Sequence, residues 1–168
     1  MQAEERFLKV YDESSAKLLR HITLRVGNQE LAEDLLQETF MKAWRTLTDQ
    51  NHNIDNLRAF IYKIASNIII DHYRSKHKES IELNENIEVP SNFNIEDSVD
   101  AALAKKQLDI LLQSLTPEAR EIIIYKYIDQ LRVTEISQIT GKSIVNINVI
   151  AFRAMKQLKI TSNERPKP

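Results

Sequence analysis

The 168-residue sequence contains no cysteine, only two glycines and only four prolines. The absence of cysteine excludes disulfides, thiolate metal sites and cysteine nucleophiles. The scarcity of glycine and proline leaves few turn formers for β-hairpins, so a helical fold is favoured. Apolar runs such as Ile68–Ile70 are far shorter than a membrane span, and the charged N-terminus lacks the apolar core of a signal peptide. We therefore expect a cytoplasmic protein without membrane insertion.

Charge is unevenly distributed, although the formal net charge is only −1. Residues 1–77 contain 11 basic and 11 acidic residues, residues 78–99 contain one lysine and six acids, and residues 100–168 contain 11 basic and seven acidic residues. The acidic middle segment includes Pro90 and lacks sustained helical periodicity. A structureless loop of this length is unusual inside a compact domain, so a linker between two helical modules is favoured over a solvated loop within one domain.

Three helices are predicted in the first module. Apolar residues recur at spacings of three, four and seven over 4–26, 29–47 and 57–77, and Gly27 is a C-cap signal between the first two. The polar segment 48–56 is expected to be an exposed loop. The expected core residues are Phe7, Leu8, Tyr11, Leu18, Leu19, Ile22, Leu31, Leu35, Phe40, Trp44, Phe60, Ile61, Ile64, Ala65, Ile68 and Ile69.

Four helices are predicted in the second module, over 100–113, 117–128, 133–139 and 143–159. Thr116 is a good N-cap for the second of them, because Pro117 follows it and suits the first helical turn. The expected core residues of that helix are Ile122, Ile123 and Tyr127.

The end of the second module has the pattern of a helix-turn-helix. A short helix is followed by Gly141 in the turn and by a longer helix that begins at Ser143. Glycine suits the turn because a tight turn of this kind uses a left-handed backbone conformation. Ser143 can cap the second helix and can also contact a DNA phosphate. Taken alone, the pattern also fits a helical hairpin with no role in DNA binding.

Three segments together resemble the extracytoplasmic function (ECF) group of sigma factors, in the sigma-70 family, over nearly the whole chain. Residues 28–47, NQELAEDLLQETFMKAWRTL, are similar to the conserved second helix of that group. Residues 57–76, LRAFIYKIASNIIIDHYRSK, are similar to the helix that reads and melts the −10 element. Residues 111–143, LLQSLTPEAREIIIYKYIDQLRVTEISQITGKS, are similar to the domain that binds the −35 element.

This resemblance implies an all-α fold with two small helical domains. Sigma region 2, a helical bundle, is expected over residues 1–77, and sigma region 4, with its helix-turn-helix, over residues 100–160. The acidic segment 78–99 is expected to be a flexible linker, and residues 161–168 are expected to be a disordered tail.

The resemblance also implies a function. It predicts a sigma factor that binds core RNA polymerase, recognises promoters and opens DNA for transcription initiation, without enzymatic activity or a cofactor. The implied partners are promoter DNA, the clamp helices of the largest polymerase subunit and the flap of the second subunit. An anti-sigma factor is expected as well, because members of this family are commonly held inactive by one.

The resemblance places the polymerase-binding residues on the second helix. They are Asp34, Gln37, Glu38, Thr39 and Met41. Spacings of three and four put all of them except Thr39 on one helix face, and a polar, partly acidic face can pair with a basic partner helix. A solvated acidic face would have the same pattern.

The residues expected to bind the −10 element lie in the loop before the third helix and along that helix. They are Asn51, His52, Asn53, Arg58, Lys63, Asn67, Asp71 and Arg74. Basic side chains neutralise phosphates, and asparagine and histidine can read the edges of an unstacked base. His72 and His77 are five residues apart, a spacing that does not share a helix face well, so no metal site is expected there.

The residues expected to bind the −35 element are Lys142, Ser143, Asn146, Asn148, Arg153 and Lys156. The chain departs from the family here, because no cation occurs between Lys142 and Arg153, where lysine and arginine are typical. Fewer phosphate contacts should weaken DNA affinity. Two interpretations remain open. Either the helix reads an A/T-rich element through asparagine and apolar contacts, or an accessory DNA-targeting factor docks on Val149, Ile150 and Phe152.

Two other classes of function remain as alternatives. The chain could be a stand-alone helix-turn-helix regulator, or a sigma-like adapter that binds polymerase but not promoters. An enzyme is disfavoured, because the sequence has no glycine-rich phosphate loop, no nucleophile motif and no cluster of metal ligands.

Overall fold

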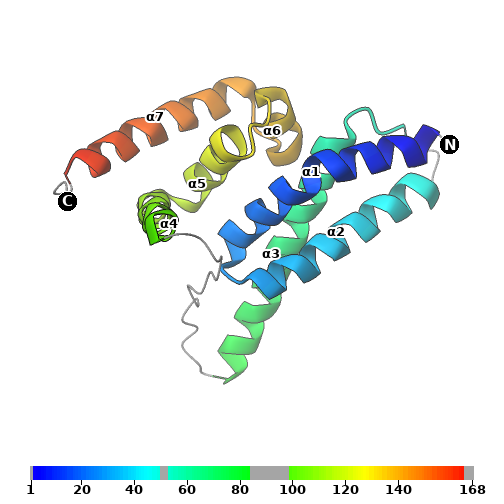
Figure 1. Cartoon of the computed structure of the whole chain (residues 1–168), viewed down its shortest axis with the longest axis horizontal. Coiled ribbons are helices and arrows are strands. Elements are labelled where there is room, and N and C mark those ends of the chain that lie inside the picture. The colour runs from blue at the N-terminus through cyan, green and yellow to red at the C-terminus, as the bar shows by residue number, and fades with distance from the viewer. Residues whose placement is uncertain (1, 50–52, 84–98, 165–168) are drawn as a thin grey trace. The chain divides into compact units, whose positions relative to one another are not determined.

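The computed structural model describes residues 2–49, 53–83 and 99–164, and within these ranges every regular element is a helix (Figure 1). The all-α prediction is therefore confirmed. The chain divides into two compact units, Met1–Phe93 and Asn94–Pro168. In the described ranges, no helix combines the length and the apolarity that a membrane crossing requires.

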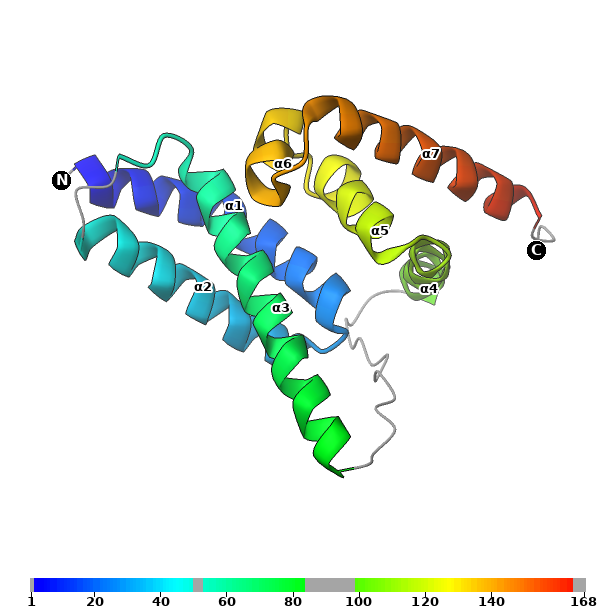
Figure 2. The ribbon, with the colours of Figure 1, turned by 180° about the vertical axis from the view of Figure 1, so that it is seen from behind.

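The first unit contains three long helices, α1 (Gln2–Val26), α2 (Gln29–Asp49) and α3 (Leu57–Leu83). α1 and α2 lie side by side, and α3 crosses both of them, as Figures 1 and 2 show from opposite sides. The core between them includes buried residues from all three helices: Leu18, Ile22, Ala32, Leu35, Phe40, Ala43, Ile61, Tyr62, Ala65 and Ile69.

One glycine and two asparagines determine where these helices begin and end. Gly27 has a φ of 70°, a left-handed conformation that ends α1, and its amide donates to the carbonyl of Thr23 at 2.9 Å. The side chain of Asn28 accepts a hydrogen bond from the amide of Leu31 at 2.9 Å and so caps α2. Asn56 caps α3 in the same way through the amide of Ala59.

The predicted apolar face of α1 is wrong in its N-terminal half. Leu8 is 53% exposed and Tyr11 is 42% exposed. The reason is that α1 buries a continuous face only further along, and its first turns are held by aromatic contacts to α2. The ring of Phe7 lies 5.0 Å from that of Trp44, and the ring of Tyr11 lies 4.7 Å from that of Phe40.

Two helices continue four or more residues beyond their predicted ends. α3 continues to Leu83, six residues into the segment expected to be a linker, and α7 (Ile144–Asn163) continues into the segment expected to be a disordered tail. Both extensions have a local cause, because neither glycine nor proline occurs in them to stop the helix. In the rest of the expected linker and tail, residues 84–98 and 165–168 lie outside the described residues, whereas Val99 begins α4 and Glu164 caps α7.

The second unit contains α4 (Val99–Gln113), α5 (Pro117–Ile123), a single π-helical turn η1 (Ile124–Ile128), α6 (Val133–Thr140) and α7. Its core includes Leu112, Leu115, Ile123, Ile124 and Ala154. Burial raises the pKa of the Asp109 carboxyl on α4, and Lys105 one turn earlier opposes that shift.

The π turn explains one wrong core prediction. The amide of Asp129 donates to the carbonyl of Ile124, five residues earlier, at 2.9 Å. A residue five positions along therefore returns to the same side of the chain, so Ile128 joins Ile123 in the core. Tyr127, which a regular α-helix would place below Ile123, is 48% exposed.

Caps position the elements around the helix-turn-helix. The hydroxyl of Thr116 accepts from the amide of Ala119 at 3.3 Å, and Pro117 stands in the first turn of α5, as predicted. Glu135 is almost fully buried at the start of α6, where its carboxylate accepts from the amide of Arg132 at 2.8 Å. The ends of α5 and α6 are thus fixed by local hydrogen bonds.

Candidate functional site

Four of the predicted polymerase-binding residues form one exposed face of α2. Asp34, Gln37 and Glu38 are exposed, and Met41 is 53% exposed. We call these four residues the α2 face. The buried residues Ala32, Leu35, Thr39 and Ala43 lie on the other side of the helix, so the α2 face is available to a partner.

The fifth predicted residue, Thr39, does not belong to this face. Its side chain is fully buried, and its hydroxyl donates to the carbonyl of Leu35 at 2.7 Å. Direct contact between Thr39 and a partner is therefore excluded in this conformation. A position one residue away from Glu38 is turned by about 100° around the helix axis, which takes Thr39 into the core.

One ion pair borders the α2 face. The ammonium of Lys42 lies 2.9 Å from the carboxylate of Glu38, one turn earlier, and both side chains are about half exposed. A pair of this kind contributes only a few tenths of a kcal/mol, roughly, to an isolated helix. It leaves Glu38 accessible and reduces the net negative charge at that end of the face.

The predicted −10 residues on α3 lie in one exposed row. Lys63, Asn67, Asp71 and Arg74 are all exposed, at spacings of four, four and three, and we call them the α3 strip. Arg58 is half-buried at the start of the helix. In the preceding loop Asn53 is exposed, whereas Asn51 and His52 lie outside the described residues.

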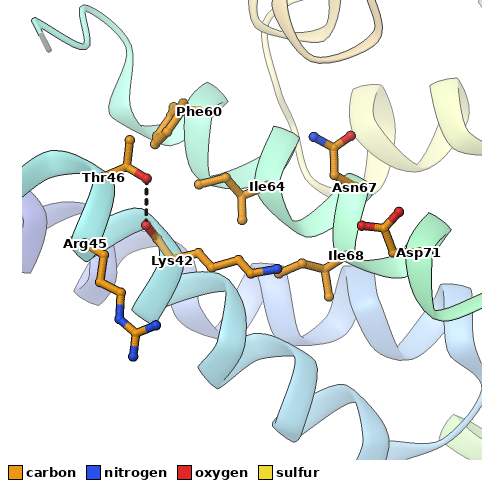
Figure 3. Close-up of a pocket in the computed structure, with 8 residues that line it drawn as sticks. All are labelled: Lys42, Arg45, Thr46, Phe60, Ile64, Asn67, Ile68 and Asp71. Carbon is orange, nitrogen blue, oxygen red and sulfur yellow. Dashed lines mark hydrogen bonds between the residues drawn. The ribbon is translucent and has the colours of Figure 1, made fainter. Parts of the chain in front are cut away.

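A groove of about 330 Å³ runs between α2 and α3. Asn67 and Asp71 of the α3 strip stand on one side of it, and Lys42 and Arg45 of α2 stand on the other. Figure 3 shows Lys42 extending along the groove toward Ile68, while Arg45 points away. The complete lining is Lys42, Arg45, Thr46, Phe60, Ile64, Asn67, Ile68 and Asp71.

The sequence analysis did not single out Lys42 and Arg45. They are the only two cations of α2, three residues apart, and that spacing was the available signal. Phe60 and Ile64 were expected in the core, but they are half-buried and line the groove. The groove thus combines the Lys42 cation, an amide, a carboxylate and apolar surface, with the Arg45 guanidinium directed away from it, a set of groups that suits a nucleotide better than a purely apolar ligand.

The loop before α3 is tied to α1. Arg6 donates a hydrogen bond of 2.7 Å to the main-chain carbonyl of Ile54. This contact joins residues 48 positions apart, and no local sequence pattern points to it. It fixes the backbone immediately after Asn53.

The helix-turn-helix has the predicted backbone. Gly141 has a φ of 74°, in the left-handed region, and ends α6. The hydroxyl of Ser143 accepts from the amide of Asn146 at 3.1 Å and caps α7. Inside the turn, Ser137 donates to the carbonyl of Lys142 at 2.6 Å. Lys142 itself is half-buried, and its ammonium is paired with the carboxylate of Glu118 at the start of α5.

The predicted −35 residues after the turn are all exposed, Ser143 as the N-cap of α7 and the others on the helix itself: Asn146, Asn148, Arg153 and Lys156. Among the apolar residues named as a possible docking surface, Phe152 is 71% exposed and Val149 is 39% exposed, while Ile150 is half-buried. Val145, which the sequence analysis did not include in that surface, is 73% exposed. A shallow hollow of about 640 Å³ lies along this side of the helix.

Metal ligands do not gather in the described ranges. No group of three or more histidine, aspartate or glutamate side chains there could hold an ion together. The arrangement therefore offers two kinds of surface: exposed polar helix faces, and rows in which cations alternate with asparagine and apolar residues.

Family models match both units. The model described as Sigma-70 region 2 matches residues 10–79, which cover most of α1, α2 and α3. The model described as Sigma-70, region 4 matches residues 105–158, from α4 into α7. The two matches occur in this order and together cover more than half of the chain.

Curated relatives match across both units. The ECF RNA polymerase sigma factor BldN of Streptomyces coelicolor is 29% identical over 161 residues, which are 92% of this chain and 59% of the relative. The ECF RNA polymerase sigma factor SigM of Bacillus subtilis is 27% identical over 157 residues, 92% of this chain and 94% of the relative. The chain thus spans about three fifths of the length of the first relative and nearly all of the second.

Two solved structures have a similar fold. The sigma factor RpoE from Bartonella quintana, solved with the anti-sigma factor NepR, gives a TM-score of 0.73 at 23% identity and covers 96% of this chain and 98% of its own. CnrH, solved with the cytosolic domain of CnrY, gives a TM-score of 0.72 at 20% identity, with coverage of 98% and 95%.

Proposed function

This chain belongs to the ECF group of the sigma-70 family, whose members are non-enzymatic DNA-binding initiation factors, and we propose that it recruits core RNA polymerase to promoters and opens the DNA there. The observation that carries this proposal is the succession of region 2 and region 4 along one chain. A stand-alone helix-turn-helix regulator would not need the first unit with its exposed α2 face. The protein would act in the cytoplasm, where RNA polymerase works.

The α2 face is proposed to bind the polymerase core. Its accessible residues are two acids, one amide and Met41, a flexible apolar side chain suited to an interface. Such a face can pair with the clamp helices of the largest subunit, provided that those helices are basic on the matching side. The second unit would contact the flap of the second subunit.

The first unit is also proposed to read and melt the −10 element. The α3 strip contains two cations and Asn67, and the α2–α3 groove adds Lys42 and Arg45 beside Phe60. Cations attract the DNA backbone, and an aromatic edge with an amide can hold an unstacked base. Asn51, His52 and Asn53 would read a base from the loop. Because no nucleotide-hydrolysis motif is present in the sequence, melting would be driven by binding free energy.

The second unit is proposed to face the −35 element with reduced electrostatic affinity. Lys142 is engaged by Glu118, and the next cation on the recognition helix is Arg153, in its third turn. Fewer phosphate contacts lower the affinity and its salt dependence. We therefore propose that an additional DNA-targeting partner supplies part of the affinity at its promoters.

The proposed roles correspond to separate segments of the chain. We propose region 2 over residues 1–77, an acidic linker over 78–99, region 4 over 100–160 and a tail over 161–168, with α3 continuing into the start of the linker. The two similar structures were solved as complexes with partner proteins, one of them named as an anti-sigma factor. We propose that an anti-sigma factor also controls this chain.

Transcription in vitro tests the proposal. The full chain is added to purified core polymerase over a library of promoters, and start sites are mapped. We expect enrichment of one −10-like motif at a fixed distance from the start sites. Absence of any enriched motif would overturn the proposal. A pull-down with core polymerase separates the alternatives, since a stand-alone regulator would not bind core and an adapter would bind core without enriching a motif.

A further inference from the structure

α7 carries an exposed apolar stripe on the side that faces away from its own unit. Val145 is 73% exposed, Val149 is 39% exposed and Phe152 is 71% exposed. We call these three residues the α7 stripe. They are spaced by four and three positions, so they form one row along the helix. The buried residues of α7, which are Ile147, Ala151 and Ala154, lie on the opposite side.

The surroundings of the stripe are positively charged. The 20 residues of α7 include no aspartate or glutamate, whereas Arg153, Lys156 and Lys159 carry positive charge. Arg153 and Lys156 line the same hollow as the stripe, as does Asn148. Asn146 is exposed on the other flank. A partner that matches this surface must be anionic overall and must offer apolar groups at its centre.

The major groove of A·T-rich DNA has both properties. Its edges are lined by phosphates, and thymine is the one base that presents a methyl group there. Adenine presents the N6 and N7 pair that asparagine can bind with two hydrogen bonds. We propose that the α7 stripe reads the C5 methyl groups of thymines in the −35 element, with Asn146 and Asn148 reading adenines beside them. This inference rests on the proposed function, in which the second unit faces promoter DNA.

The dimensions of the helix agree with this role. Val145 and Val149 lie in the first two turns of α7, the part of a recognition helix that contacts base edges. From Val145 to Phe152 the helix rises by about 10 Å, which corresponds to roughly three base-pair steps. Arg153 and Lys156 follow in the third and fourth turns, from where long side chains reach phosphates at the groove edge. Sequence selectivity would thus come mainly from methyl contacts and little from charge.

Replacing thymine by deoxyuracil removes the methyl group and leaves base pairing intact. The full chain with core polymerase is assayed for open-complex formation on one promoter, with single deoxyuracil substitutions at each thymine of the −35 element. We expect about a fourfold loss of affinity for each methyl group that the stripe contacts, with no such loss for deoxyuracil in the spacer between the elements.

Variants of the stripe complete the test as a double-mutant cycle. Val149→Ala and Phe152→Ala should each weaken binding to the thymine promoter and should abolish the loss at one deoxyuracil position. Ile160→Ala is the matched control, because Ile160 is also an exposed apolar residue of α7 (52%) but lies about two turns beyond Phe152. It should leave both affinities unchanged.

Each result supports or overturns the inference. Equal binding of thymine and deoxyuracil promoters would overturn it. It would also be overturned if Val149→Ala and Phe152→Ala lost affinity equally on the thymine and deoxyuracil promoters, because the stripe would then act independently of the methyl groups. Failure of the wild-type chain to open the unmodified promoter would instead contradict the proposed function itself, so the two failures are distinguishable.

Discussion

The guanidinium of Arg6, in the first turns of α1, donates a hydrogen bond of 2.7 Å to the main-chain carbonyl of Ile54, in the loop before α3. Because the acceptor is a backbone atom, a change of side chain at position 54 does not remove it. The bond holds the loop at a point next to Asn53, one of the residues proposed to read the −10 element.

Arg6→Ala should therefore loosen the loop without unfolding the protein. An exposed hydrogen bond contributes about 1 kcal/mol or less to stability, so the melting temperature should change little. Discrimination between the preferred −10 sequence and single-base variants should fall by roughly twofold to tenfold, measured by open-complex formation. Lys9→Ala, at another exposed cation of α1, is the control and should preserve discrimination. Unchanged discrimination in Arg6→Ala would show that the bond has no positioning role.

Glu38→Lys should weaken binding to core polymerase. The substitution reverses a charge on the α2 face and replaces the Glu38–Lys42 attraction by repulsion. We expect a loss of at least about tenfold in affinity, measured by titration of labelled core, if the partner surface is basic. Asp49→Lys is a matched control, because Asp49 is an exposed acid at the C-terminal end of α2, eleven residues beyond Glu38. Equal losses in both variants would argue for a general charge effect.

Thr39→Val should affect stability and leave polymerase binding unchanged. The valine keeps the shape of the buried side chain and removes the hydroxyl that donates to Leu35. A loss of about 1 kcal/mol or less is expected in thermal unfolding, because the carbonyl of Leu35 retains its position in the helix. Any direct contribution of Thr39 to the interface would appear as a loss of affinity in the folded variant, and that result would contradict the burial described above.

Gly141→Ala should destabilise the second unit through its backbone conformation alone. The φ of 74° is unfavourable for alanine by about 1–2 kcal/mol, whereas an added Cβ would meet no atom within 4 Å. Gly141→Asn should cost less, because asparagine adopts the left-handed region more readily. Thermal unfolding followed by circular dichroism compares the two variants. The reverse order would mean that the turn changes its conformation on substitution.

Local sequence signals predicted most of the helices. Gly27, Thr116 and Gly141 act on their immediate neighbours, and a cap or a left-handed turn needs no information from distant residues. The candidate residues on α2 and α7 were implied by the family resemblance, and helical spacing added that four of those on α2 share one exposed face.

The errors arose where distant packing decides the outcome. Leu8 has the right spacing for a core position, but the first turns of α1 extend beyond the continuous core. The assignment of Thr39 to polymerase binding rested on the family resemblance, which implies a role for a position but does not show whether its side chain is buried. The Arg6–Ile54 bond joins residues 48 positions apart, a contact that periodicity cannot reveal.

The π turn from Ile124 to Ile128 shifts the helical register of the second unit by one residue. Helical positions counted forward from Pro117 give the correct inward side only as far as Ile123, and the count must be restarted one residue later. An alignment with a relative that has a regular helix at this place therefore needs a one-residue gap inside the turn. Without that gap, Tyr127 would be matched to a buried position of the relative, and its exposed ring would be mistaken for core.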